Sequence, residues 1–222
     1  PGVIRLTQGY YNFLGGITFN PLLVQIQGDG GVTLDFSAVG AGTAIRLISP
    51  FTAGESVSRN KLRTHLSGIT LKGAATTLLV DLTSTGGVDN SCLTFRNICF
   101  DTFGEGIRLA SNAWQLTLQD YSFTNGSADA PHINELSDAA EVNFGECNRF
   151  LNGIHSGLGK GYRSRNYNSD AHFIGVSFDC SQFMDLSRGV RAMLSNCHFE
   201  TAADTSVLFS VDGDIGGFAQ TM

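Results

Sequence analysis

A six-position pattern of apolar and polar residues recurs along the chain. It consists of an apolar residue, two small or polar residues, another apolar residue, a polar residue and a closing phenylalanine, and the third copy has one extra residue. The closing residues recur every 21 to 28 positions, at Phe100, Phe123, Phe150, Phe178 and Phe199. A repeat of this length is typical of solenoids, propellers and other repeat architectures.

The pattern within each copy predicts short strands. No copy has apolar residues at the i, i+3, i+4, i+7 spacing of a helix, and the intervening segments are rich in residues that favour turns. A coil of about 24 residues holds three strands of roughly 4–5 residues and three bends, and coils stack by parallel pairing at about 4.8 Å. Propeller blades are longer, and the leucine-rich consensus is absent. The sequence therefore predicts an all-β parallel β-helix, a solenoid of about 20–28-residue coils, as one domain over residues 1–222.

Alignment of the copies predicts columns of equivalent residues. The inward column consists of Ile98, Tyr121, Cys147, Val176 and Cys197. The column at the preceding bend consists of Asn97, Asp120, Glu146, Gly175 and Asn196. Asn, Asp and Gly favour left-handed backbone geometry at a bend, so we interpret this second column as a structural turn ladder.

Composition and charge exclude some functions. A net charge of −6 argues against binding to nucleic acid. No apolar run reaches the roughly 18 residues of a membrane span, so we expect no membrane insertion. The five cysteines lack metal-type spacing, and the two in the inward column are interpreted as small apolar core residues. We expect neither a metal nor a cofactor.

The first coils resemble the start of pectin-lyase-like β-helices, especially those of bacteriophage tailspikes. The resemblance rests on the strand at Gly9–Tyr11 and on the glycine-rich strand pair from Ile26 to Leu34, which has an additional Gly31. It implies a right-handed parallel β-helix that forms a homotrimer in the virion tail. It also implies binding, and often cleavage, of a bacterial surface polysaccharide such as a capsule, an exopolysaccharide or an O-antigen.

Three segments interrupt the repeat and are predicted to be loops: residues 51–67, 127–140 and 156–170. The last combines aromatic, cationic and amide side chains, which can stack on sugars and pair with carboxylates. The candidate substrate-binding residues there are Lys160, Tyr162, Arg163, Arg165 and Tyr167, with His155 just before the loop. The alternative is an exposed turn or a contact with a neighbouring chain. Trp114 is either a core residue or a sugar platform.

Carboxylates supply the candidate catalytic groups. Alignment places them in a column that consists of Asp101, Thr124, Leu151, Asp179 and Glu200. Neighbouring coils would bring Asp179 and Glu200 to about 5 Å, the separation of a retaining glycosidase pair. A second column contains Glu105 and His155, with Glu105 as a third catalytic candidate. The alternative is that these carboxylates are ordinary solvent-exposed residues of surface turns without a catalytic role.

Three functions remain open on this reasoning. The first is a tailspike-like protein that binds a bacterial polysaccharide and depolymerises it by hydrolysis or by elimination. In an elimination, the base would be His155, Lys160 or Tyr162, and Arg163 or Arg165 would neutralise the uronate. The second is a receptor-binding or structural spike without catalysis. The third is a secreted bacterial pectinase-like lyase. Because the chain begins at Pro1 without a signal-peptide pattern, we expect a piece of a longer, virion-associated protein.

Overall fold

The computed structural model describes residues 2–49, 63–83, 90–110, 113–136, 145–166, 169–187, 190–200 and 209–212. Within these ranges the chain is almost entirely extended, with a single short 3₁₀ helix at Ser37–Val39. The strands are β1 (Gly2–Leu6), β2 (Gly9–Asn12), β3 (Ile17–Phe19), β4 (Val24–Asp35), β5 (Thr43–Leu47), β6 (Leu66–Lys72), β7 (Leu78–Asp81), β8 (Asn90–Ser91), β9 (Thr94–Phe103), β10 (Glu105–Leu109), β11 (Ala113–Trp114), β12 (Thr117–Gly126), β13 (Pro131–Glu135), β14 (Asn148–Ser164), β15 (Asp170–Ile174), β16 (Ser177–Ser187), β17 (Arg191–Ser195), β18 (His198–Phe199) and β19 (Phe209–Asp212). No helix long and apolar enough to cross a membrane occurs in the described part of the chain.

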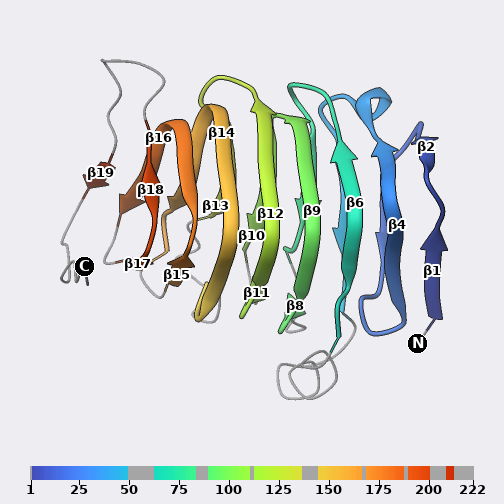
Figure 1. Ribbon diagram of the computed structural model, residues 1–222, viewed down its shortest axis with the longest axis horizontal. Helices are drawn as coiled ribbons and strands as arrows, with labels where there is room; N and C mark the ends of the chain where they lie inside the picture. Colours follow the sequence, from blue (N-terminus) through green and yellow to red (C-terminus); the bar gives the residue numbers. More distant parts are fainter. Residues whose placement is uncertain are drawn as a thin grey trace.

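Parallel pairing between successive coils organises these strands. Strands β4, β6, β9, β12, β14 and β16 lie side by side in chain order, as Figure 1 shows. A second row of neighbours contains β3, β5, β7, β10 and β13, and β13 pairs with the end of β14. This curled, parallel sheet fits a β-solenoid and agrees with the predicted all-β, parallel architecture.

The core is built from ladders of equivalent side chains. One ladder runs through Leu34, Leu71, Phe100, Phe123, His155, Phe178 and Phe199. Its rings stack from coil to coil: the centroids of Phe100 and Phe123 are 4.4 Å apart, and those of His155 and Phe178 are 4.9 Å apart. Stacked rings exclude water from this side of the interior, so the ladder stabilises one register over its alternatives.

The predicted alignment of the third copy is wrong by five residues. Phe150 pairs with Leu118 and Phe173, whereas His155 occupies the position of the closing phenylalanine. The true copy is therefore Phe150 to His155, which ends in histidine where the others end in phenylalanine. A template that required phenylalanine at the end could not find it.

The turn ladder is confirmed, with one member replaced. The residues at this bend have φ between 51° and 66° and are Gly31, Gly68, Asn97, Asp120, Asn152, Gly175 and Asn196. Asn152 takes the place predicted for Glu146. Only Gly, Asn and Asp occur here because they adopt left-handed geometry at low cost.

The same shift corrects the inward column at its third coil. Cys147, predicted there, is exposed, and Gly153 holds the position beside Tyr121. A Cβ atom at Gly153 would lie 2.0 Å from Cζ of Tyr121. The tyrosine ring thus fills the space of two residues.

The predicted loops are partly wrong. Residues 66–67 begin β6, residues 131–135 form the buried β13, and residues 156–164 belong to the long strand β14. In each case polar residues within a strand resembled a loop in the sequence. Residues 51–62 and 137–140 lie outside the described residues.

Candidate functional site

The outer side of one strand row presents polar side chains in register. The strands involved are β2, the end of β4, β6, β9, β12, the middle of β14, the start of β16 and β18, and we call their outer side the groove face. Because side chains alternate across a strand, the residues on either side of the core ladder point outward together. One outward row consists of Thr33, Thr70, Cys99, Ser122, Ile154, Ser177 and His198.

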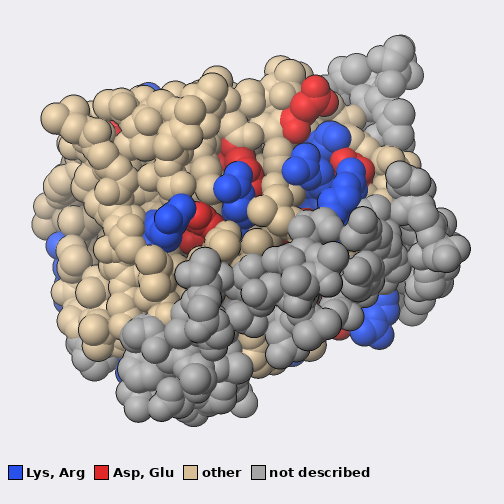
Figure 2. Space-filling view, turned by 180° about the vertical axis from the view of Figure 1, so that it is seen from behind, with Lys and Arg blue, Asp and Glu red and all other residues tan. Residues whose placement is uncertain are grey.

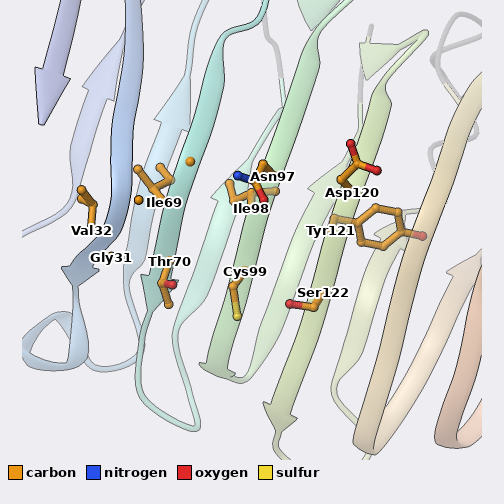
Figure 3. Close-up of a pocket in the computed structure, with 12 residues that line it drawn as sticks. Gly31, Val32, Ile69, Thr70, Asn97, Ile98, Cys99, Asp120, Tyr121 and Ser122 are labelled. Carbon is orange, nitrogen blue, oxygen red and sulfur yellow. The ribbon is translucent and has the colours of Figure 1, made fainter. Parts of the chain in front are cut away.

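A groove of about 310 Å³ follows this row across four coils, from β4 to β12. We call it the axial groove. Its lining combines the outward side chains Thr70, Cys99 and Ser122 with the turn ladder, in which Asn97 and Asp120 occupy successive bends (Figure 3). At the two earlier coils the ladder contributes Gly31 and Gly68, where a Cβ atom would lie 3.1 Å from Gln8 Cγ and 2.3 Å from the Gly28 carbonyl oxygen, so the missing side chains allow neighbouring protein segments to pack closely.

Charged groups around the axial groove are paired. Arg96 Nε lies 3.6 Å from Asp120 Oδ2, and Asn152 donates a hydrogen bond of 3.3 Å to Asp120 Oδ1. Lys72 Nζ lies 3.7 Å from Asp35 Oδ2. The groove therefore offers hydroxyl, amide and carboxylate groups at the spacing of the coils.

A second groove, of about 360 Å³, lies at another bend of the coils. We call it the corner groove, and it is lined by Cys92, Thr94, Gln115, Thr117, Cys147 and Arg149. Three of these, Cys92, Gln115 and Cys147, have φ between 52° and 55° and form another left-handed bend. Among the described residues that line it, the corner groove has a cation, Arg149, and no carboxylate.

The predicted proximity of Asp179 and Glu200 is correct. The pair Phe178–Phe199 aligns β16 with β18, and the Glu200 N–H donates to the Phe178 carbonyl at 2.9 Å. One ligand atom from each of Asp179, His198 and Glu200 lies within 4.8 Å of the other two. Such a group could share a cation, although exposed acidic groups often occur without one.

Hydrogen bonds define the surroundings of this pair. Ser177 Oγ donates to Asp179 Oδ1 at 2.8 Å and lies 3.2 Å from His198 Nδ1. Asp179 is half-buried, whereas His198 and Glu200 are exposed. Neither the axial nor the corner groove includes the pair in its lining. The predicted carboxylate column is also corrected at one position, because Ser156 rather than Leu151 precedes Asp179.

The third catalytic candidate, Glu105, lies on a different face. It accepts hydrogen bonds from Arg108 Nε at 2.9 Å and from Asn134 Nδ2 at 2.7 Å. The predicted column that joined Glu105 to His155 is wrong, since His155 belongs to the core ladder and Glu105 pairs with Leu78. Glu105 is thus part of a charged outer face and does not join the Asp179–Glu200 pair.

That face carries alternating charges, visible as a row of blue and red side chains in Figure 2. Its ion pairs include Arg46–Asp81 at 2.9 Å and two cations on one carboxylate, Lys160 and Arg165 on Asp185, at 2.9 and 2.8 Å. Partial burial would raise the pKa of Asp185, but hydrogen bonds and attraction from the two cations outweigh it and lower that pKa. Arg163 Nε donates to Asn134 Oδ1 at 2.9 Å. The predicted cationic binding loop is therefore a paired strand surface.

Several other predicted binding residues are inside the protein. Tyr162 is fully buried, with its hydroxyl 2.6 Å from Ser169 Oγ, and burial raises its pKa well above 10.0. His155 is also fully buried. Trp114 is half-buried in β11, and its Nε1 has no hydrogen-bond partner among the described residues. Tyr167 lies outside the described residues.

His155 belongs to a buried chain of hydrogen-bonded side chains, and this position differs from its predicted role in substrate binding. His132 Nε2 is 3.1 Å from the Leu158 carbonyl, to which it must donate, so its Nδ1 accepts from His155 Nδ1 at 3.2 Å. His155 Nε2 then accepts from the Tyr121 hydroxyl at 3.1 Å. Every group in this chain is satisfied with both histidines neutral, and burial lowers the pKa of His132 to about 4.

Sequence reasoning missed two buried groups that matter for stability, His132 and Glu135. Glu135 is fully buried, has no cationic partner among the described residues, and accepts hydrogen bonds from Asn148 Nδ2 at 2.8 Å and Ser164 Oγ at 2.9 Å. Burial raises its pKa to about 7, against the opposing effect of these and neighbouring hydroxyl groups. No periodic signal marks both, because they lie three positions apart in β13, a strand that is buried along its whole length.

Comparisons with known proteins give similarity to solved structures but none at the level of sequence families. No protein-family model matches the sequence, and no curated protein matches it. A solved structure, ORF18 of Geobacillus virus E2, is 12% identical with a TM-score of 0.38, and the match covers 98% of this chain. The chain spans about half of that protein, 54% of its length.

Proposed function

We propose that this chain is part of a bacteriophage tailspike-like protein, a right-handed parallel β-helix, and that it binds a bacterial surface polysaccharide along the axial groove. The proposal rests on the repetition of polar groups along that groove. From β6 to β12, each coil adds a hydroxyl or thiol, at Thr70, Cys99 and Ser122.

Physical reasoning favours a polymer as the occupant. Coils repeat at about 4.8 Å, close to the length of one sugar unit, so equivalent protein groups meet successive units of an extended chain. Neutral donors and acceptors suit the hydroxyl groups of sugars. A homotrimer on the virion tail, which the family resemblance implies, would multiply weak contacts by avidity.

Binding is tested with immobilised capsular polysaccharides and lipopolysaccharide O-chains and the purified chain. The variants Thr70→Arg and Ser122→Arg fill the axial groove from outward-facing positions and should weaken binding about tenfold or more, or by at least 1.4 kcal/mol. The matched control is Thr117→Arg, which places the same side chain in the corner groove from the same strand as Ser122. Loss of binding in the control but not in the two variants would refute the assignment.

A second function, hydrolysis of the bound polymer, is supported by the proximity of Asp179 and Glu200. A carboxyl pair at about 5 Å suits a retaining mechanism, in which one group is nucleophile and the other is acid and base. New reducing ends should appear with the unmodified chain and disappear in Asp179→Asn and Glu200→Gln. The control Asp101→Asn removes a carboxylate from the same outer face and should retain activity.

Elimination is the less favoured chemistry. Two of its candidate bases, Tyr162 and His155, are fully buried, and the candidate cations are paired with Asp185 and Asn134. A lyase would release unsaturated uronates, which absorb in the ultraviolet. Their appearance together with new reducing ends would overturn the hydrolytic assignment, and polymer binding without either signal would leave an adhesive spike.

A further inference from the structure

We infer that the axial groove selects sugar units by charge: it accepts neutral or ammonium-bearing units and rejects uronates. This inference rests on the proposed function and adds the chemical class of the polymer.

The lining of the groove is the first observation. Asp120 is the one acidic or basic side chain among the residues that line it, and no Lys or Arg takes part. A uronate placed in this groove would lose hydration and meet a carboxylate. Removing a charged group from water without a partner is costly, whereas an ammonium group would meet a carboxylate of opposite charge.

Two cations beside the groove already form ion pairs. Arg96 pairs with Asp120 itself, and Lys72 pairs with Asp35. The next carboxylate on the groove face, Asp101, is held by Asn125, which donates at 2.7 Å, and adds another negative charge. A uronate would therefore have to break an existing ion pair to find a cation.

The corner groove provides an internal comparison. It contains Arg149 and no carboxylate, so its charge preference should be opposite. Each groove also contains a cysteine, Cys99 in the axial groove and the exposed Cys147 in the corner groove. These two thiols report the local electrostatic potential without any knowledge of the natural polymer.

The first experiment compares the rates at which the two thiols react with methanethiosulfonates that carry an ammonium or a sulfonate group. Peptide mass spectrometry follows both cysteines in the same sample. The ammonium-to-sulfonate rate ratio should be about fivefold higher at Cys99 than at Cys147 in low salt. Equal ratios, or a higher ratio at Cys147, would overturn the inference.

Asp120→Asn identifies the group responsible. Asparagine already holds the equivalent bend at Asn97, so the fold should be retained. The substitution removes the carboxylate and frees Arg96, so the ratio at Cys99 should fall by about fivefold while that at Cys147 stays constant. An unchanged ratio at Cys99 would show that Asp120 does not determine the charge preference of the axial groove, and would overturn the role of this residue.

The second experiment sorts the polysaccharide panel into neutral, amino-sugar and uronate-containing members. Binding by the first two classes that Ser122→Arg abolishes supports both the function and the inference. Binding only by uronate polymers, abolished by the bulky neutral variant Ser122→Phe, overturns the inference and leaves the proposed function. Absence of binding by every class overturns the function, and with it the inference.

Discussion

Glu135 should make the protein less stable as pH rises, and Glu135→Gln should remove this effect. The carboxyl is fully buried and accepts hydrogen bonds, and no cation in the described part of the chain pairs with it. Glutamine has nearly the same shape and keeps the acceptor for Asn148, and the Ser164 hydroxyl can rotate to accept from the new amide. The substitution therefore changes the charge while preserving the packing.

The magnitude follows from the pKa of Glu135, raised by burial from 4.5 to about 7. Below pH 4.5 the group is protonated in the folded and unfolded chains, so it has no effect on the pH dependence. As pH rises towards 7 the unfolded chain releases the proton first, and stability falls. The full difference is about 3 kcal/mol, from roughly 1.4 kcal/mol for each pH unit.

Urea unfolding of both proteins between pH 4.5 and 8 tests this prediction. The variant should gain stability relative to the unmodified chain as pH rises, and the difference should level off above pH 7. The control is Asp185→Asn, because the pKa of that paired carboxyl is lowered and its loss should destabilise the protein at neutral pH. A difference for Glu135→Gln that is constant with pH, or that shrinks as pH rises, would refute the reasoning.

Three further predictions concern the core and the bends. Gly153→Ala should destabilise the chain by about 3 kcal/mol in urea unfolding, because its Cβ would overlap the Tyr121 ring, and Tyr121→Ile should restore part of the loss. Asn152→Ala should cost about 1 kcal/mol at its left-handed bend, whereas Asn152→Gly should be nearly neutral; equal effects would contradict the role of φ. Acid should destabilise the fold through His132, because the unfolded chain takes up a proton at this side chain below pH 6.5, whereas the folded chain does so only near its pKa of about 4. Thermal melts of the Glu135→Gln protein from pH 7 to 4 should show this loss of stability without the opposite pH effect of Glu135, and a melting temperature that does not change with pH would contradict the prediction.

The placement of Asp179 beside Glu200 could be predicted from the sequence because both follow a clear copy of the repeat. Their relation depends only on the register of adjacent coils, which Phe178 and Phe199 define. The third copy could not be aligned in the same way. Its closing residue is His155, and its inward position is Gly153, so both apolar markers are missing.

The prediction of a substrate-binding loop was wrong for a related reason. Lys160, Arg163 and Arg165 have the composition of an exposed loop, yet they belong to or follow β14 and pair with polar groups of neighbouring coils. Tyr162 lies between them in the chain and is fully buried. A single sequence does not reveal that a charged residue will meet its partner one coil away.

The sequence by itself determined the parallel strands, the coil length and the left-handed bends, because these depend on local periodicity and on the backbone preferences of Gly, Asn and Asp. Tertiary structure decided which polar groups face outward, which ion pairs neutralise them and which ones are buried. Those outcomes depend on contacts between coils that are 20 or more residues apart in the chain, such as Tyr121 with His155. The axial groove belongs to this second class, because its lining comes from four coils at once.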